Sequence, residues 1–303
     1  MKRNLGSYIA SILCNGAIVV LIVAFTLSLR KGLIVEPVKA GFFCGDTSIQ
    51  YPEKHESVST NVLIVVGVLS VLVITGIIEF FNQRNCAIEK KSSCCGVNGA
   101  NQWFINAVRN FLMFLLGLCI TALLVELGKA YSGVLRPNFL AVCNPNITCS
   151  DQDPFKYHIN YRCQNTEDGD CRDCRKSFPS GHAAVVAFMA FFICLYLQNR
   201  PQAFKRCFLV RPLLQLIAAC LAWVTSLTRV SDHVHHVSDV IVGFVLGIVI
   251  AIWTLRMANE ANQMYSNNQE VKANDPQDIS LKSYNASVKE SVNNHNPPPN
   301  VES

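Results

Sequence analysis

The chain has 303 residues, of which 50% are hydrophobic and only 16% are charged, and its formal net charge is +5. Its mean hydropathy is positive, at +0.27. Soluble globular domains carry about 25% charged residues, so this composition argues against an ordinary soluble protein. It also gives no reason to expect a nucleic-acid partner.

The apolar residues are concentrated in six near-continuous runs, at residues 9–29, 62–81, 104–125, 183–197, 212–227 and 239–255. A helix needs roughly 20 apolar residues to cross the hydrocarbon core of a bilayer. The fourth and fifth runs are shorter, and need neighbours such as Gly181, His182 or Arg211 to complete a span. A very apolar soluble core is the alternative, but repeated runs separated by polar loops disfavour it. The sequence therefore predicts an all-α, polytopic membrane protein with six transmembrane helices.

The two ends of the chain differ in character. Lys2 and Arg3 precede the first run, as in a signal peptide, but the run is too long and lacks a cleavage site, so we expect a retained span. After Arg256 the chain is rich in Asn, Ser, Gln, Lys and Pro, and cannot bury enough apolar surface to offset its ordering entropy. We expect a six-span domain over residues 1–257 and a disordered cytoplasmic tail over 258–303.

The 14 cysteines divide by position. Four lie within predicted spans and behave there as small apolar groups: Cys14, Cys119, Cys194 and Cys220. Six lie in the first and third loops: Cys44, Cys143, Cys149, Cys163, Cys171 and Cys174. Six spans place both loops on the same side, where an even number of cysteines indicates disulfides and an oxidising compartment. The alternative is zinc, because Cys171-Arg-Asp-Cys174 has ligand spacing, although no second pair accompanies it.

A glycosylation sequon supports the same orientation. Asn146-Ile-Thr148 lies in the cysteine-rich third loop, so we expect Asn146 to be glycosylated on the outer, extracellular or lumenal, side. A second sequon at Asn285 lies in the predicted cytoplasmic tail and is discounted. Basic residues beside the predicted inner span ends add only a weak positive-inside bias.

Three polar motifs lie at the predicted outer span ends. In chain order they run from Lys129 to Arg136-Pro137, from Pro179 through Ser180-Gly181 to His182, and from Thr228-Arg229 through His235 to Asp239. Each alone has an ordinary explanation, as interfacial cations, a turn before a helix, or a polar interfacial stretch. Together they place three cations, two candidate histidines and a carboxylate at one membrane face.

These residue types suit phosphoryl transfer. Two arginines and a lysine are charge-assisted donors for a phosphate, and the amides of Ser180 and Gly181 can add donors at a helix N-terminus. Asp239 follows His235 by four residues, so on one helix the two would touch. The carboxylate would fix the imidazole tautomer and leave the other ring nitrogen to attack phosphorus. His182 can then protonate the departing alkoxide.

The three motifs resemble the signature of the type 2 phosphatidic acid phosphatase superfamily: Lys-x6-Arg-Pro, Pro-Ser-Gly-His and Ser-Arg-x5-His-x3-Asp. Thr228 stands where the signature has its first Ser. The first outer loop, 41–52, and the segment 136–143 are similar to the eukaryotic lipid phosphate phosphatases. The resemblance covers roughly residues 5–257 and leaves the tail unexplained.

The resemblance implies a role for each motif position: Lys129, Arg136 and Arg229 bind phosphate oxygens with Ser180 and Gly181, His182 is the general acid, His235 forms the phosphohistidine, and Asp239 orients it. It also implies an Mg-independent enzyme without a metal cofactor, acting on phosphatidate, lysophosphatidate, ceramide-1-phosphate or sphingosine-1-phosphate held in the bilayer. The predicted site has no obvious carboxylate cluster for a divalent ion.

Other functions remain as alternatives. A catalytically inactive relative would act as a membrane interaction protein, and a different enzyme on this scaffold would be a lipid phosphotransferase or a sugar-phosphate phosphatase. A transporter is disfavoured because the ionisable residues cluster at one face. The plasma membrane is the favoured location, with an endomembrane as the alternative. The resemblance also allows a homo-oligomer, for which the sequence specifies no interface.

Overall fold

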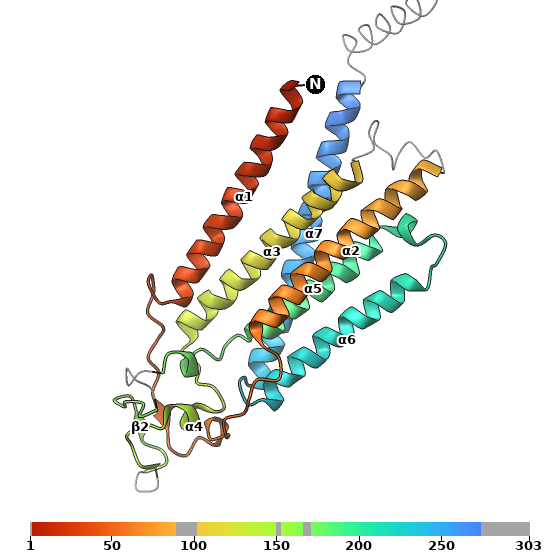
Figure 1. Ribbon diagram of the computed structural model, residues 1–303. Coiled ribbons are helices and arrows are strands. Elements are labelled where there is room, and N and C mark those ends of the chain that lie inside the picture. The colour runs from red at the N-terminus through yellow and green to blue at the C-terminus, as the bar shows by residue number, and fades with distance from the viewer. Residues whose placement is uncertain (1, 89–101, 150–152, 166–170, 274–303) are drawn as a thin grey trace, which may run out of the picture.

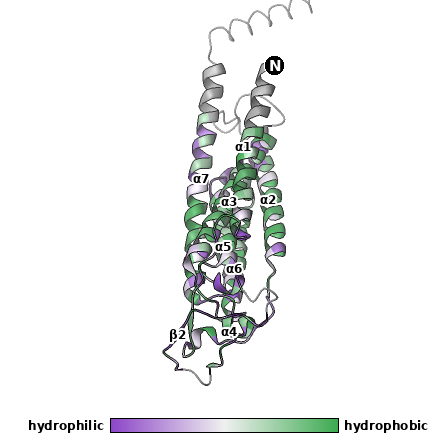
Figure 2. Ribbon diagram, turned by 90° about the vertical axis from the view of Figure 1, so that its left-hand side faces the viewer, coloured by the Kyte–Doolittle hydropathy of each residue, from purple (hydrophilic) through white to green (hydrophobic). Residues whose placement is uncertain are grey.

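The structure, a computed structural model, describes residues 2–88, 102–149, 153–165 and 171–273. It has six long helices: α1 (Lys2–Arg30), α2 (Thr60–Ile88), α3 (Gln102–Ser132), α5 (Gly181–Gln198), α6 (Val210–Ser231) and α7 (Val237–Ala273). Each is long and apolar enough to cross a membrane, and Figure 1 shows them side by side in one bundle. Apolar residues run along the helices (Figure 2), as a lipid-facing surface requires. The prediction of an integral membrane protein with six spans is confirmed.

The end of the last span differs from the sequence prediction. We expected disorder from residue 258, but α7 continues to Ala273. Ala258 is buried, and the Asn262 side chain donates to Asn110 of α3, so the first residues of the expected tail pack against the bundle. Extending a formed helix is also easier than nucleating a new one. The remainder of the predicted tail, 274–303, lies outside the described residues.

The helix α5 lies at the centre of the bundle. Of its span 56% is buried inside the protein, whereas the other spans are 11% to 33% buried. Its Phe188, Phe192 and Tyr196 rings follow one another along one side, and the Phe114 ring of α3 lies 5.1 Å from that of Phe192. A helix buried on all sides is apolar all round. For this reason the sequence of the fourth apolar run does not show which side of α5 faces which neighbour.

Two glycines let α7 approach the start of α5. A Cβ on Gly243 would collide with the carbonyl oxygen of Ser180, and one on Gly247 with that of Ala184. The pair has the small-xxx-small spacing that permits close helix packing in membranes. As a result, the Ser180 amide donates to the Asp239 carbonyl at 3.0 Å, which joins the first turn of α7 to the residue that precedes α5.

A buried polar cluster connects the helices at the opposite end of the bundle. The Glu79 carboxylate of α2 accepts hydrogen bonds from the Tyr196 hydroxyl (2.8 Å), Arg200 Nε (2.8 Å) and Asn110 Nδ2 (3.1 Å). Glu79 is 2% exposed, so these donors and the Arg200 charge compensate for its burial. The short helix η4 (Pro201–Phe204) follows Arg200 at this end.

The loops before α2 and α5 form a small disulfide-bonded layer at one end of the bundle, here called the loop end (Figure 1). It contains β1 (Phe42–Phe43) antiparallel to β2 (Tyr157–His158), with η1 (Thr47–Ile49), α4 (Phe139–Cys143) and η3 (Asp173–Arg175). The structure pairs Cys44 with Cys149, Cys143 with Cys163, and Cys171 with Cys174. The six loop cysteines therefore pair among themselves.

Candidate active site

The structure brings the three motifs together at the loop end. Lys129 lies in the last turn of α3, Arg136 between α3 and α4, His182 in the first turn of α5, Arg229 in the last turn of α6, His235 just before α7, and Asp239 in its first turn. Their side chains come from four long helices and the segments that join them. The convergence predicted from topology is therefore present.

His235 and Asp239 are neighbours, although not on one helix as we expected. The helix α7 begins at Val237, so His235 lies in the connection before it. His235 Nδ1 is 3.9 Å from Asp239 Oδ2, which is an ion-pair distance longer than a hydrogen bond. Both side chains are almost fully buried, at 3% and 2% exposure. Because Nδ1 faces the carboxylate, the other ring nitrogen, Nε2, is left to react.

The electrostatics of His235 favour the neutral imidazole. Burial lowers its pKa to about 4; Asp239 opposes this shift, and the cations of Arg136 and Lys129 add to it. A neutral imidazole has a free lone pair, so at neutral pH the ring is in the protonation state that a nucleophile would require. Attack on phosphorus would make the ring cationic, and the adjacent carboxylate would stabilise that charge.

Ser177 is a site residue that the motifs did not identify. Its hydroxyl donates to Asp239 Oδ2 at 2.5 Å, and its side chain is fully buried. The same oxygen accepts the His236 amide at 3.0 Å. Short hydrogen bonds to an ionised oxygen are strong, so Ser177 fixes the carboxylate that faces His235.

His182 faces the site from α5. Its Nε2 lies 3.3 Å from Thr60 Oγ1 and 3.4 Å from Arg229 Nη1. A guanidinium only donates, so Nε2 accepts from Arg229 in this arrangement and carries no proton. A phosphate bound beside Arg229 would place an anion near Nε2 and favour its protonation.

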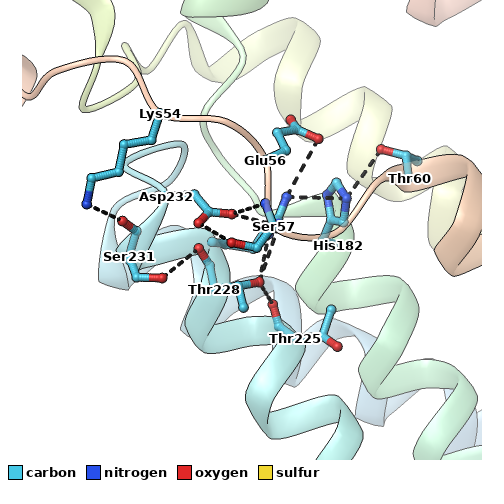
Figure 3. A network of polar contacts seen from close by, with 10 residues as sticks. Lys54, Glu56, Ser57, Thr60, His182, Thr225, Thr228, Ser231 and Asp232 are labelled. Atoms are coloured by element: carbon cyan, nitrogen blue, oxygen red, sulfur yellow. Dashed lines mark hydrogen bonds and ion pairs between the residues drawn. The ribbon is translucent and has the colours of Figure 1, made fainter.

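Arg229 is the most enclosed of the three cations. Its side chain is 0% exposed. Its partners Asp232, His182 and Glu56 belong to a network of polar residues from α6, α5 and the loop before α2 (Figure 3). Nη2 donates to Asp232 Oδ2 at 3.0 Å, and Thr228 Oγ1 accepts from Nε and Nη2 at 3.3 and 3.2 Å. Nη1 points toward His182 and lies 3.8 Å from Glu56 Oε2.

The other two cations are also removed from water. Lys129 is 16% exposed and lies 3.6 Å from Glu126 Oε1. The Nε atom of Arg136 is buried and has no hydrogen-bond partner among the described residues. Burial lowers the pKa of Arg136, although Asp173 and Glu56 oppose this, and Arg229 lowers it further. Cations that lose water without full compensation are stabilised by an anionic ligand.

Ser180 and Gly181 lie as predicted at the start of α5, but the Ser180 amide is not available to a ligand. It donates to the Asp239 carbonyl. The Ser180 hydroxyl is instead the free group, because Oγ is buried without a partner in the described part of the chain. Gly181 is the first helical residue, so its amide points out of the helix. A Cβ on Gly181 would lie 3.4 Å from Val125 Cγ1 and 3.5 Å from Lys129 Nζ, so the start of α5 lies close to the lysine.

The two histidines without an assigned role have backbone partners. His233 Nδ1 lies 3.2 Å from the Pro52 carbonyl, and His236 Nε2 lies 2.9 Å from that of Leu135. Both rings therefore hold neighbouring loops in place. Of the three histidines in this motif, only His235 faces Asp239, as the four-residue spacing predicted.

The contribution of the first outer loop was missed by sequence reasoning. Thr60, Ser57 and Glu56 come from this loop or its junction with α2, and reach the site from far along the chain. No motif spacing encodes such a contact, and the similarity of 41–52 to lipid phosphate phosphatases ends before these residues. Across the residues that the structure describes, no group of three or more His, Cys, Asp or Glu gathers as a metal site would require.

Comparison with known proteins gives a consistent family. The model of the PAP2 superfamily matches residues 110–263. Phospholipid phosphatase 1 of Rattus norvegicus is 34% identical over 78% of this chain and 81% of its own length. Phospholipid phosphatase-related protein type 1 of Xenopus tropicalis is 30% identical over 80% of this chain and 79% of its own. A Drosophila melanogaster relative is 31% identical over 73% of this chain, which spans 61% of that relative.

No solved structure matched the chain. Because the family model matches over half of its length and these relatives cover most of it, this chain belongs to the PAP2 superfamily.

Proposed function

We propose that this protein is an integral membrane lipid phosphate phosphatase that acts through a phosphohistidine at His235. The observation that carries the proposal is a buried imidazole that faces the Asp239 carboxylate. Burial, together with the charges of Arg136 and Lys129, lowers the pKa of His235 and favours its neutral form. Membership of the PAP2 superfamily and similarity to proteins named phospholipid phosphatase support it. The substrates are phosphate monoesters such as phosphatidate, lysophosphatidate, ceramide-1-phosphate and sphingosine-1-phosphate, whose acyl chains stay in the bilayer.

In the first step, the phosphate binds Arg229, Lys129 and Arg136, and His235 Nε2 attacks phosphorus. The bond from phosphorus to the lipid oxygen breaks, its electron pair stays on that oxygen, and His182 donates a proton to it. The products are a lipid with a neutral hydroxyl group and a phosphohistidine. Asp239 balances the positive charge on the modified ring.

In the second step, a water molecule attacks the phosphohistidine. His182, now neutral, accepts the proton of the water, the bond from phosphorus to nitrogen breaks, and His235 returns to its neutral form. Inorganic phosphate leaves the cations. Phosphoryl transfer depends mainly on positioning and charge neutralisation, which the lysine and arginines supply here, so we propose that no Mg²⁺ is required.

The proposed orientation places the loop end on the extracellular or lumenal side. The three disulfides belong in an oxidising compartment. Asn146 lies on the exposed surface of the same layer, where a glycan would have room, and we propose that it is glycosylated. The plasma membrane is the proposed location, because it presents lipid phosphates to an outward-facing site.

The central experiment is a turnover assay. Vesicles that contain the purified full-length protein receive lysophosphatidate with a chelator present, and phosphate release is measured. We expect release from the wild type, none from His235→Ala, and an acid-labile phosphoenzyme only where His235 is present. The matched control is His233→Asn, two residues away, because asparagine tolerates the positive φ of 58° at that position. Substantial turnover by His235→Ala would refute the nucleophile assignment.

The competing proposal is a catalytically inactive membrane interaction protein. One relative named a phosphatase-related protein is nearly as similar as those named phosphatases, so similarity alone does not separate the two. The residues do favour the enzyme, since every proposed catalytic position carries its functional group at the site. A folded wild-type protein that releases no phosphate from a panel of lipid and sugar phosphates would support the alternative.

A further inference from the structure

Asp232 lies at the end of α6, three residues after Arg229, and its carboxylate is fully engaged. Oδ2 accepts from Arg229 Nη2 at 3.0 Å and from the Ser57 amide at 2.8 Å, while Oδ1 accepts the Ser57 hydroxyl at 2.6 Å. The residue is 5% exposed, and its own amide donates to the Thr228 carbonyl. This carboxylate therefore joins the arginine of the third motif to the first outer loop (Figure 3).

Asp232 and Thr228 together hold one edge of the Arg229 guanidinium. They accept from Nη2 and Nε, which leaves Nη1 directed toward His182. A planar fork held along one edge presents its remaining donors in a fixed direction. A carboxylate beside the arginine weakens the attraction of the arginine for phosphate, so a gain in attraction does not explain why Asp232 is there. The way Asp232 orients the guanidinium does explain it.

The loop of residues 51–59 lies across the same region. Lys54 Nζ donates to the Ser231 carbonyl at 3.0 Å, and the Tyr51 ring lies 4.7 Å from that of His233. Beyond Ser57 the chain enters α2 at Thr60, which contacts His182. The loop is thus attached to the α6–α7 connection on one side and to the proposed general acid on the other.

We propose that Asp232 is a positioning residue of this site, which orients Arg229 toward His182 and fastens the 51–59 loop beside the bound phosphate. The inference rests on the proposed function. Because one carboxylate serves both partners, the position of the loop and the direction of the arginine are coupled. Admission of a lipid headgroup that moves Ser57 would also loosen Arg229.

The test separates phosphate binding from turnover. Orthovanadate, a phosphate mimic, is titrated against the purified full-length protein in detergent, and its affinity is obtained from the rise in unfolding temperature. We expect Asp232→Asn to weaken vanadate binding by roughly tenfold, because an ionised acceptor is replaced by a neutral one. The matched control is Ser231→Ala, which removes only an exposed hydroxyl that donates to the Thr228 carbonyl.

A double-mutant cycle tests whether Asp232 acts through the arginine. In an Arg229→Gln background, Asp232→Asn should change vanadate affinity by less than about twofold, since its target is already gone. An equal loss in both backgrounds, or no loss in either, would overturn the inference. The loop arm is tested by Ser57→Ala, which removes one of the two hydrogen bonds from Ser57 to Asp232. It should raise KM for lysophosphatidate several-fold and, through the shared carboxylate, weaken vanadate binding by a smaller factor, about two- to threefold. An unchanged KM would overturn that arm.

Misfolding of the variant and failure of the proposed function are each distinguished from failure of the inference. If Asp232→Asn does not fold, Asp232→Glu keeps the charge but lengthens the side chain by one methylene. An intermediate loss of vanadate affinity is then expected, and wild-type affinity would refute the positioning role. A folded wild-type protein that does not bind vanadate would refute the proposed function itself. If the wild type and the Asp232→Asn variant bind vanadate equally well, only the positioning role of Asp232 is refuted.

Discussion

Removal of the Ser177 hydroxyl is the sharpest test of the proposed nucleophile. Ser177→Ala deletes the 2.5 Å hydrogen bond to Asp239 Oδ2 in a fully buried setting, and leaves the His236 amide as the donor to that oxygen. A hydrogen bond to a charged group contributes about 1.5–3 kcal/mol. If this stabilisation acts mainly in the transition state, where the His235 ring becomes cationic, kcat/KM falls by roughly tenfold to hundredfold.

The assay is steady-state hydrolysis of lysophosphatidate in mixed micelles, with vanadate affinity measured in parallel. We expect kcat to fall and vanadate affinity to stay near the wild-type value, because the three cations are untouched. The matched control is Ser132→Ala, whose hydroxyl donates to the Phe178 carbonyl in the same region but does not contact Asp239. A folded Ser177→Ala protein with kcat/KM within about twofold of wild type would show that this hydrogen bond does not support the reaction.

Three further predictions follow from the geometry. Glu56→Gln removes the carboxylate that lies 3.8 Å from Arg229 Nη1. Inorganic phosphate should then inhibit hydrolysis more strongly, by up to about fivefold for a half-exposed ion pair. Weaker inhibition by phosphate would contradict this prediction. Gly243→Ala should reduce thermal stability and activity, because its Cβ meets the Ser180 carbonyl, whereas Gly76→Ala, with open space around it, should match the wild type in both assays. Because the pKa of His235 is lowered to about 4, protonation should remove the nucleophile only near that pH. The contrary result would be a fall in kcat/KM as the pH drops through the ordinary histidine pKa of about 6.5, if ionisation of the substrate does not explain that fall.

The spans and the main site residues were predictable from sequence because both follow local rules. An apolar run in a bilayer must be helical to satisfy its backbone hydrogen bonds, so six runs gave six helices. The spacing from His235 to Asp239 selected the histidine whose ring faces this carboxylate, even though α7 begins only at Val237. The error at the other end of α7 has an equally local cause, since hydropathy marks where lipid contact ends and not where the helix ends.

Long-range contacts were not predictable in the same way. Ser57 meets Asp232 across 175 positions, and Thr60 meets His182 across 122, so no spacing within a motif reports them. The Ser180 amide illustrates a different limit. A residue at a helix start was a sound candidate for an anion donor, but the close approach of α7 gives that amide a carbonyl partner and leaves the hydroxyl as the available group.

The second and third motifs act as one unit because a single aspartate joins them. The carbonyl of Asp239 accepts the Ser180 amide, while its carboxylate accepts the Ser177 hydroxyl and faces His235. This arrangement requires the first turn of α7 to lie against the start of α5, which the two glycines of α7 permit. A side chain at either glycine would displace the Asp239 carboxylate from the imidazole and from Ser177, and the Asp239 carbonyl from the Ser180 amide, at once. The packing of two helices within the membrane therefore sets the geometry of the proposed chemistry at its surface.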